Sequence, residues 1–237
     1  MILAAGEGTR LRPLTNQLPK ALVPLGGVPL VQLILEWLKS YEVCEVAINL
    51  HHLGEKIADF CGDGSRFGLK VTYSSEGALL GTAGGVKRMH RFFGKTFVVV
   101  YGDILTNFNL KKMIEFHESK GAIVTIAAYQ NCHQEGCGVL RLNHQGQVIQ
   151  FVEKPEIPKK RRGLSNGGVY VLRKEVLNYI PGRSYYDFGF DVFPKLIDLG
   201  VPIYGYTLSD EEYLTDIGTW QRMQKANEDI KLGKFQL

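Results

Sequence analysis

Residues 1–15 read MILAAGEGTRLRPLT, in which a short apolar run leads directly into a turn that contains two glycines. The apolar run predicts a buried β-strand, and two arginines and a threonine follow the glycines. Backbone N–H groups in such a turn, together with fixed cations, can hold a phosphate group. The stretch predicts the first strand and a phosphate-binding turn of an α/β fold. An ordinary glycine-rich turn with solvated arginines has the same local pattern.

Two well-known phosphate-binding patterns fail in this turn. The dinucleotide-binding pattern requires a third glycine three residues after the second, and Leu11 stands there. The Walker pattern requires a Gly-Lys-Ser/Thr sequence, which does not follow. The turn therefore predicts a phosphate site of another kind, with cations available from Arg10, Arg12 and Lys20.

The composition predicts a globular protein with a substantial core, since 45% of the 237 residues are hydrophobic and 22% are charged. A net charge of +4 suits an anionic small molecule and is low for a nucleic-acid-binding surface. The basic segment PKKRRG (158–163) is interpreted as a solvated loop. No apolar run is long enough to cross a membrane. We therefore expect a cytoplasmic protein without nucleic-acid or membrane partners.

The four cysteines are interpreted as reduced thiols. The segment NCHQEGC places Cys132, His133 and Cys137 near one another in the sequence. This spacing matches no common zinc site, and no fourth ligand is evident, so we expect no structural zinc there.

Apolar runs of strand length alternate with amphipathic stretches in the first part of the chain. Residues 45–50, 97–103 and 122–129 are nearly continuous apolar runs, which are typical of strands buried on both faces of a parallel sheet. The stretches 29–42 and 109–121 between them have helical periodicity, and Asn109 is a candidate N-cap. This alternation predicts an α/β class with a doubly wound, mostly parallel sheet.

The later part of the chain has a more mixed pattern. Apolar and polar residues alternate through 138–155 around the turn NHQGQ, which predicts a β-hairpin, and 166–172 predicts a further strand. We expect one domain over residues 1–237, in which the pattern of apolar and polar residues changes near residue 130. Helices are predicted at 173–180, 191–200 and 219–233.

Six blocks of the sequence together resemble the sugar-1-phosphate nucleotidylyltransferases. In chain order they are LAAGEGTRLRPLT with PKALVP, LGTAGG (80–85), VVVYGD ending at Asp103, FVEKP (151–155), NGGVYVL (166–172) and YLTDIGT (213–219). The resemblance is nearest to manno-heptose or mannose 1-phosphate guanylyltransferases and N-acetylmuramate 1-phosphate uridylyltransferases. It implies a Rossmann-like, nucleotide-diphospho-sugar transferase fold with a sugar-binding, β-rich insertion.

The resemblance also implies a reaction and a division of the chain. The family joins a nucleoside triphosphate to a sugar 1-phosphate, releases pyrophosphate and uses Mg²⁺. Residues 1–130 then form the nucleotide-binding half and residues 131–237 the sugar-phosphate-binding half. A homodimer is compatible with the resemblance, and we expect no left-handed β-helix, such as some relatives carry, within these residues.

Site residues are carried over from the matching blocks. The resemblance implies that Arg10, Lys20 and Asp103 are catalytic and that Asp103 and Asp216 hold Mg²⁺. The implied nucleotide-binding residues are Leu3, Ala4, Ala5, Gly6, Gly8, Thr9, Arg10, Lys20, Glu76, Gly81 and Thr82. The implied sugar-phosphate-binding residues are Gly138, Glu153, Lys154 and Asn166. Without the resemblance, an ordinary solvated ion pair is the favoured interpretation of Glu153 and Lys154.

Glu76 bears on which nucleobase is used. It stands five residues before Gly81, where the family places a base-reading side chain. A carboxylate only accepts hydrogen bonds, and guanine offers adjacent N–H donors, so we expect GTP. The blocks GLSNGGVYVL (163–172) and YLTDIGT resemble those of manno-heptose and mannose 1-phosphate guanylyltransferases, and this resemblance implies a manno-configured sugar 1-phosphate. The alternative is a UTP-dependent enzyme for N-acetylmuramate or hexose 1-phosphate, because such relatives also carry a glutamate at the position of Glu76.

Functions of other classes are less compatible with these residues. A non-catalytic nucleotide-sugar-binding protein is one alternative, but Arg10, Lys20, Asp103 and Asp216 are all present. A dinucleotide-dependent oxidoreductase requires an acidic residue after the second strand, where this chain reads NLHH.

Overall fold

The computed structural model describes residues 1–130, 136–155, 163–182 and 184–236. Cys132, His133 and most of the basic segment 158–163 lie outside these residues, so the predictions made for them are not tested. The chain forms two compact units whose segments alternate along the sequence. Unit 1 comprises residues 1–79, 100–108 and 211–237, and unit 2 comprises residues 80–99 and 109–210. The functional division near residue 130 stays a prediction.

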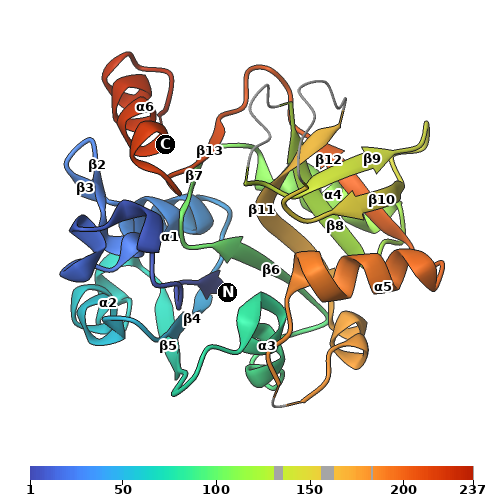
Figure 1. Ribbon diagram of the computed structural model, residues 1–237, viewed down its shortest axis with the longest axis horizontal. Coiled ribbons are helices and arrows are strands. Elements are labelled where there is room, and N and C mark those ends of the chain that lie inside the picture. Colours follow the sequence, from blue (N-terminus) through green and yellow to red (C-terminus); the bar gives the residue numbers. More distant parts are fainter. Residues whose placement is uncertain (131–135, 156–162, 183, 237) are drawn as a thin grey trace. The chain divides into compact units, whose positions relative to one another are not determined.

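Unit 1 is built on parallel strands (Figure 1). Strand β1 (Ile2–Leu3) pairs in parallel with β4 (Glu45–Leu50) and with the end of β6 (Thr96–Tyr101), and β5 (Lys70–Ser75) pairs in parallel with β4. Ile2 lies opposite both Ile48 and Val100. Because the strands are parallel, their carboxyl ends meet at one edge of the sheet, which is where α/β folds bind ligands.

Helices and short strands complete unit 1. Helix α2 (Gly54–Cys61) packs against β4 and β5, and α1 (Leu30–Ser40) packs against β7 (Ile104–Thr106). Strand β7 pairs antiparallel with β13 (Leu214–Asp216), against which α6 (Trp220–Lys231) packs. The remaining elements are β2 (Pro24–Leu25), β3 (Val28–Pro29) and the 3₁₀ turns η1 (Thr9–Leu11), η2 (Leu14–Asn16), η3 (Lys20–Leu22) and η4 (Ser65–Phe67).

Unit 2 contains the β-rich part of the chain (Figure 1). Strand β8 (Val124–Tyr129) pairs antiparallel with β11 (Leu164–Arg173) and parallel with β12 (Ile203–Thr207). Strand β11 also pairs with β9 (Val139–Leu142), which forms a hairpin with β10 (Val148–Val152). The helical elements are α3 (Gly81–Arg88), α4 (Leu110–Ser119), η5 (Lys174–Tyr179), the π-helical turn η6 (Phe188–Val192) and α5 (Phe193–Asp198).

Most of the predicted elements are confirmed. The strand at 45–50 and the hairpin are present, and Asn109 caps α4 by accepting a hydrogen bond from Lys112 N at 3.0 Å. The hairpin turn is held by Asn143 Oδ1, which accepts from the backbone N–H groups of Gln145 and Gln147. The α/β class with a mostly parallel sheet and a β-rich part is therefore confirmed.

The helix types in the later part differ from the prediction. The helix expected at 173–180 is a 3₁₀ helix over Lys174–Tyr179. The helix expected from residue 191 begins earlier, as the π-helical turn η6, and continues as α5. Asp187 caps this turn, because its Oδ1 accepts from the N–H groups of Gly189 and Phe190. Among the described residues, no helix is long and apolar enough to cross a membrane.

The core of unit 2 includes a cluster of aromatic rings around Phe193. Its ring centroid lies 5.1 Å from those of Phe151 and Tyr170 and 5.5 Å from that of Phe188. Phe193, Tyr170 and Phe188 are fully buried. Aromatic pairs at these separations add to the free energy gained from burial alone.

We expect Phe193→Ala to lower the free energy of unfolding by about 3–5 kcal/mol, because it leaves a cavity among these rings. Denaturant unfolding measures the change. Phe190→Ala is the matched control, since Phe190 lies in the adjacent turn and is 57% exposed. The control should change stability by only about 0.5 kcal/mol. Equal losses for the two variants would contradict the assignment of Phe193 to the core.

Candidate functional site

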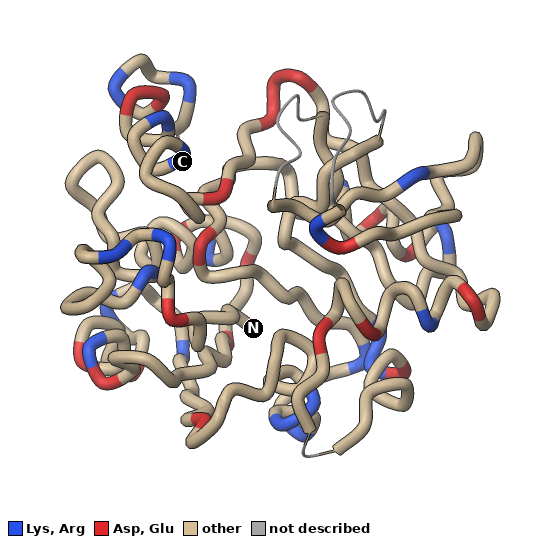
Figure 2. Tube along the Cα trace, in the orientation of Figure 1, with Lys and Arg blue, Asp and Glu red and all other residues tan. Residues whose placement is uncertain are grey.

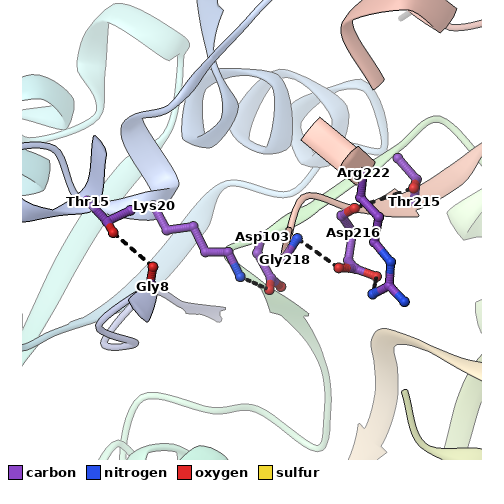
Figure 3. Close-up of polar contacts among 8 residues, drawn as sticks. All are labelled: Gly8, Thr15, Lys20, Asp103, Thr215, Asp216, Gly218 and Arg222. Carbon is purple, nitrogen blue, oxygen red and sulfur yellow. Dashed lines mark hydrogen bonds and ion pairs between the residues drawn. The ribbon is translucent and has the colours of Figure 1, made fainter. Parts of the chain in front are cut away.

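The glycine-rich turn follows β1 in unit 1. Ala4 and Ala5 are buried, while Gly6, Thr9 and Arg10 are exposed. Gly8 has a φ of 65°, in the left-handed region, and a Cβ added there would lie 2.9 Å from Thr15 Cγ2. Thr15 Oγ1 donates a hydrogen bond to Gly8 O at 2.8 Å (Figure 3). The shape of the turn is thus set by Thr15 and requires glycine at position 8.

Lys20 and Asp103 form an ion pair beside this turn. Lys20 begins η3 and Asp103 follows β6, and Lys20 Nζ lies 2.5 Å from Asp103 Oδ2 (Figure 3). The side chains are only 15% and 23% exposed. Burial alone raises the pKa of Asp103, but the Lys20 ammonium and the Arg10 guanidinium outweigh it and hold that pKa below its usual value. Asp103 is therefore a carboxylate at neutral pH.

Asp216 stands on the strand next to Asp103. It lies opposite Ile104 in the β7–β13 pair, and Ile217 N donates to Asp103 O at 2.9 Å. The Asp216 carboxylate accepts from Gly218 N at 2.8 Å and from Arg222 Nη1 at 2.6 Å (Figure 3). The strand pairing thus brings two carboxylates that are far apart in the sequence to neighbouring backbone positions.

Arg10 belongs to the same group of charges. A Cβ added at Gly218 would lie 3.0 Å from Arg10 Nη2, so Arg10 extends from the glycine-rich turn to the loop after β13. We call Arg10, Lys20, Asp103, Asp216 and Arg222 the charged cluster. Elsewhere in unit 1 both signs of charge are interspersed, as on α6 (Figure 2).

The charged cluster has the groups that a phosphate with a divalent cation requires. Lys20 and Arg10 offer N–H donors with positive charge, and Asp103 and Asp216 offer hard oxygen ligands. Among the described residues, no group of three His, Cys, Asp or Glu side chains could hold a metal ion by itself. Mg²⁺ commonly takes one or two carboxylates and completes its shell with water and substrate phosphates, so the two aspartates fit that mode.

Glu76 follows β5 in unit 1 and is buried. Its Oε1 accepts a hydrogen bond from Asn49 Nδ2 at 2.8 Å. Its backbone N–H donates to Leu50 O at 2.8 Å, and its carbonyl accepts from His51 Nδ1 at 2.8 Å. Because a carbonyl cannot donate, His51 carries its proton on Nδ1. The predicted base-reading residue is held through both its backbone and its side chain.

Gly81 and Thr82 lie in unit 2, at the start of α3. Gly81 has a φ of 72°, and a Cβ there would lie 2.5 Å from Tyr186 O. Thr82 Oγ1 donates to Asp187 Oδ2 at 2.8 Å and accepts from Phe188 N at 2.9 Å. The Thr82 hydroxyl thus joins α3 to η6, and its predicted contact with a nucleotide stays a prediction.

Glu153 follows β10 in unit 2 and is packed against two glycines. A Cβ at Gly138 would lie 2.7 Å from Glu153 Oε2, and a Cβ at Gly189 would collide with the same oxygen. The side chain is 14% exposed. Burial raises the pKa of Glu153 above its usual value; Lys154 opposes this effect and Asp187 adds to it. The sequence alone favoured an ordinary solvated ion pair between Glu153 and Lys154. A largely buried Glu153 carboxylate does not fit that interpretation.

The other two predicted sugar-phosphate residues differ in exposure. Lys154 is 55% exposed, with Nζ 3.9 Å from Glu153 Oε1, and its φ of 43° lies in the left-handed region. Asn166 is held within β11, where Oδ1 accepts from Gly168 N and Nδ2 donates to the Tyr170 hydroxyl. Their roles toward a substrate stay predictions.

Four residues near the predicted positions were not found by sequence reasoning. Asn49 is the one polar residue in the apolar end of EVAINL, which is a detectable signal. Arg222 lies on α6, in the first turn after the TDIGT block. Asp187 and Gly189 lie in the segment DFGFD, where an acidic residue before an apolar helix start indicates an N-cap.

Comparison with known proteins identifies a family. The family described as nucleotidyl transferase matches residues 1–232. A UTP–glucose-1-phosphate uridylyltransferase from Synechocystis sp. is 38% identical over 94% of the chain, and a mannose-1-phosphate guanylyltransferase from Mycobacterium tuberculosis is 31% identical over 98%. The chain spans 62% and 64% of the lengths of these two relatives.

A solved structure shares the fold. The crystal structure of HddC from Yersinia pseudotuberculosis, complexed with GMP-PN, matches with a TM-score of 0.79 and 26% identity. The match covers 97% of each chain.

Replacing Lys20 by Met tests the ion pair. Without this ammonium the pKa of Asp103 should rise, because burial then dominates. A carboxylate with a lowered pKa adds stability above its unfolded pKa of about 4, and that stability is lost as the pH falls through the folded pKa. We therefore expect Lys20→Met to lower the free energy of unfolding by about 1.5–3 kcal/mol at neutral pH and by less in acid. Denaturant unfolding at pH values above and below the Asp103 pKa measures the loss of stability in the two conditions.

Lys70→Met is the matched control in unit 1. It breaks the Lys70–Glu45 pair, which has a separation of 2.8 Å but whose side chains are 73% and 54% exposed. Exposed ion pairs contribute little, so we expect little change at either pH. If the two variants lost the same stability at both pH values, burial of the Lys20–Asp103 pair would have no energetic consequence.

Proposed function

The chain belongs to the nucleotidyl transferase family, and we propose that it joins a nucleoside triphosphate to a sugar 1-phosphate, giving a nucleotide-sugar and pyrophosphate. The observation that carries this proposal is the charged cluster beside the glycine-rich turn. There, Lys20 and Arg10 lie next to Asp103, and Asp216 lies on the adjacent strand. These residue types suit phosphoryl chemistry, in which catalysis consists mostly of positioning and electrostatic stabilisation.

The proposed step needs no general base. The nucleophile is an oxygen of the sugar phosphate, whose second pKa is about 6, so it is already charged at neutral pH. This oxygen forms a bond to the α-phosphorus, and the bond from that phosphorus to the bridging oxygen of the β-phosphate breaks. The electron pair leaves with the pyrophosphate, and no proton is transferred. The main barrier is the approach of two anions, which nearby positive charge lowers.

Residues of the charged cluster take distinct roles in this proposal. Backbone N–H groups of the glycine-rich turn and Arg10 hold the β- and γ-phosphates, and Lys20 contacts the α-phosphate and the leaving group. Asp103 and Asp216 hold Mg²⁺, which supplies further positive charge to the phosphates when bound. Because Lys20 and Asp103 are paired in the protein alone, both groups are oriented before substrate arrives.

We assign the sugar 1-phosphate to residues of unit 2. Glu153 accepts hydrogen bonds from sugar hydroxyls, Lys154 binds the phosphate, and Gly138 and Asn166 complete the contacts. The support is that Glu153 is largely buried and closely packed against glycine backbone, as a carboxylate that must keep one orientation requires. Location in the cytoplasm and a homodimer stay predictions from the sequence.

We propose GTP and a manno-configured sugar 1-phosphate as the substrates. The support is the carboxylate of Glu76, which as an acceptor suits the adjacent N–H donors of guanine, and the similarity to a guanylyltransferase. UTP with a hexose 1-phosphate is the second candidate, favoured by the 38% identity to a uridylyltransferase. Pyrophosphate release from each of five nucleotides with a panel of sugar phosphates tests both, and a preference for UTP would contradict the first.

We expect Asp103→Asn and Asp216→Asn each to reduce pyrophosphate release by about 100- to 1000-fold, because each removes a charge that holds the metal. Both variants should also lose Mg²⁺-dependent binding of the nucleotide, which calorimetry measures without turnover. Asp59→Asn is the matched control, since Asp59 is exposed on α2. Full activity in either variant would contradict the metal assignment. Nucleotide binding by a wild-type protein that releases no pyrophosphate would favour the non-catalytic alternative.

We expect Gly189→Ala to raise KM for the sugar 1-phosphate about tenfold while leaving KM for the nucleotide unchanged. Its new methyl group would displace the Glu153 carboxylate. Steady-state kinetics with each substrate varied in turn measure the two constants. Gly94→Ala is the control in unit 2, because nothing lies within 4 Å of its added Cβ. An unchanged KM for the sugar 1-phosphate in Gly189→Ala would show that sugar binding does not depend on the position of Glu153.

A further inference from the structure

We propose that Asn49 is a positioning residue that fixes the orientation of the Glu76 carboxylate and thereby sets the preference among nucleobases. This inference rests on the proposed function, in which Glu76 reads the base. It assigns a task to a residue that is not itself expected to touch the nucleotide.

Asn49 connects the carboxylate to the strand that leads into the glycine-rich turn. Its Oδ1 accepts from Ala4 N at 2.7 Å, and its Nδ2 donates to Glu76 Oε1 at 2.8 Å. Ala4 comes two residues before Gly6, and Glu76 follows β5. Asn49 stands on β4, which pairs in parallel with both β1 and β5, so its side chain can bridge the ends of both neighbouring strands.

The orientation of this amide is settled by its partners. A backbone N–H can only donate, so the atom facing Ala4 must be the Asn49 oxygen. A carboxylate accepts, so the atom facing Glu76 must be the Asn49 nitrogen. Each carboxylate oxygen has two acceptor positions, and a bond from Asn49 to Oε1 therefore orients the group without exhausting its capacity.

The local packing gives no other reason for an amide here. Asn49 is 3% exposed, and its neighbours on β4, Ile48 and Leu50, are buried apolar residues. A buried amide costs free energy unless it is hydrogen-bonded, whereas a branched aliphatic residue suits such a strand. Among the described residues, the Asn49 amide is satisfied by the two bonds that hold Ala4 and Glu76 in place.

A rigid carboxylate is what base selection requires. A site whose buried polar groups are held in one orientation penalises the wrong partner, because those groups are then left unpaired. Leu50 and His51 hold the Glu76 backbone, and Asn49 restrains the side chain through its bond to Oε1. A carboxylate free to rotate would bind several bases more equally.

Asn49→Asp tests this role with little change of shape. The aspartate can still accept from Ala4, but it places an oxygen in front of Glu76 where a donor stood. We expect the ratio of kcat/KM between the preferred and the next nucleotide to fall at least about tenfold at neutral pH, with KM for the sugar 1-phosphate unchanged. The ratio should recover as the pH falls, because a proton shared by the two carboxyls restores a donor.

Asn107→Asp is the matched control in unit 1. Asn107 also accepts from one backbone N–H, that of Tyr213, and donates through Nδ2, here to Gln236 O. This control should keep the wild-type ratio even where it loses stability. If Asn49→Asp does not fold, Asn49→Ser provides the same test, because its short hydroxyl cannot bridge both partners; the ratio should again fall about tenfold.

Three outcomes are distinguishable. A fall in the ratio that reverses in acid for Asn49→Asp, or a fall in the ratio for Asn49→Ser, supports the proposal. A folded Asn49→Asp or Asn49→Ser variant that keeps the wild-type ratio within about twofold overturns it. Absence of turnover by the wild-type protein with every nucleotide and sugar phosphate would instead overturn the proposed function.

Discussion

The ion pair between Lys20 and Asp103 is the interaction on which the organisation of unit 1 depends. A carboxylate with so little solvent around it is stable as an anion only beside a cation, and Lys20 supplies that cation from a segment 83 residues earlier. The pair joins η3, beside the glycine-rich turn, to the end of β6. Next to Asp103, Gly102 lets β1 and β6 approach closely, because a Cβ there would lie 2.8 Å from Leu3 O.

The same requirement explains the other polar contacts near the strand ends. Asp216 is held by Arg222 and Gly218, and Glu76 is held by Asn49. In each case a carboxylate is oriented by donors from the protein before any ligand is present. Groups arranged in this way need no reorganisation during a reaction, which is the main source of electrostatic catalysis. The proposed transfer between phosphates relies on this feature rather than on an acid or a base.

Local patterns in the sequence predicted the parts of the fold that local forces determine. The apolar run 45–50 forms β4, and Asn109 caps α4, since a buried strand and an N-cap need only their own residues. Helix α3 was missed because GTAGGVKR contains three glycines, which are poor helix formers. Its first turn is held by a distant group: the N–H groups of Ala83 and Gly84 donate to Tyr186 O at 3.0 Å.

The candidate site was predictable only in part for a similar reason. The resemblance implies Lys20, Asp103 and Asp216 as site residues, and the strand pairing accounts for why the two aspartates come to adjacent positions. The partners that orient these groups were not predicted. Asn49 reaches Glu76 only because β4 and β5 pair in one register, and Arg222 reaches Asp216 only because α6 packs on β13. Such contacts depend on tertiary structure, which a local pattern does not contain.

The most direct measurement is a crystal structure of the protein with Mg²⁺ and a nucleoside triphosphate analogue that cannot be cleaved at the α–β bond. We predict that phosphate oxygens lie within about 3 Å of Lys20 Nζ and of the backbone N–H groups of the glycine-rich turn. A triphosphate bound away from that turn, with Lys20 and Asp103 untouched, would contradict the account.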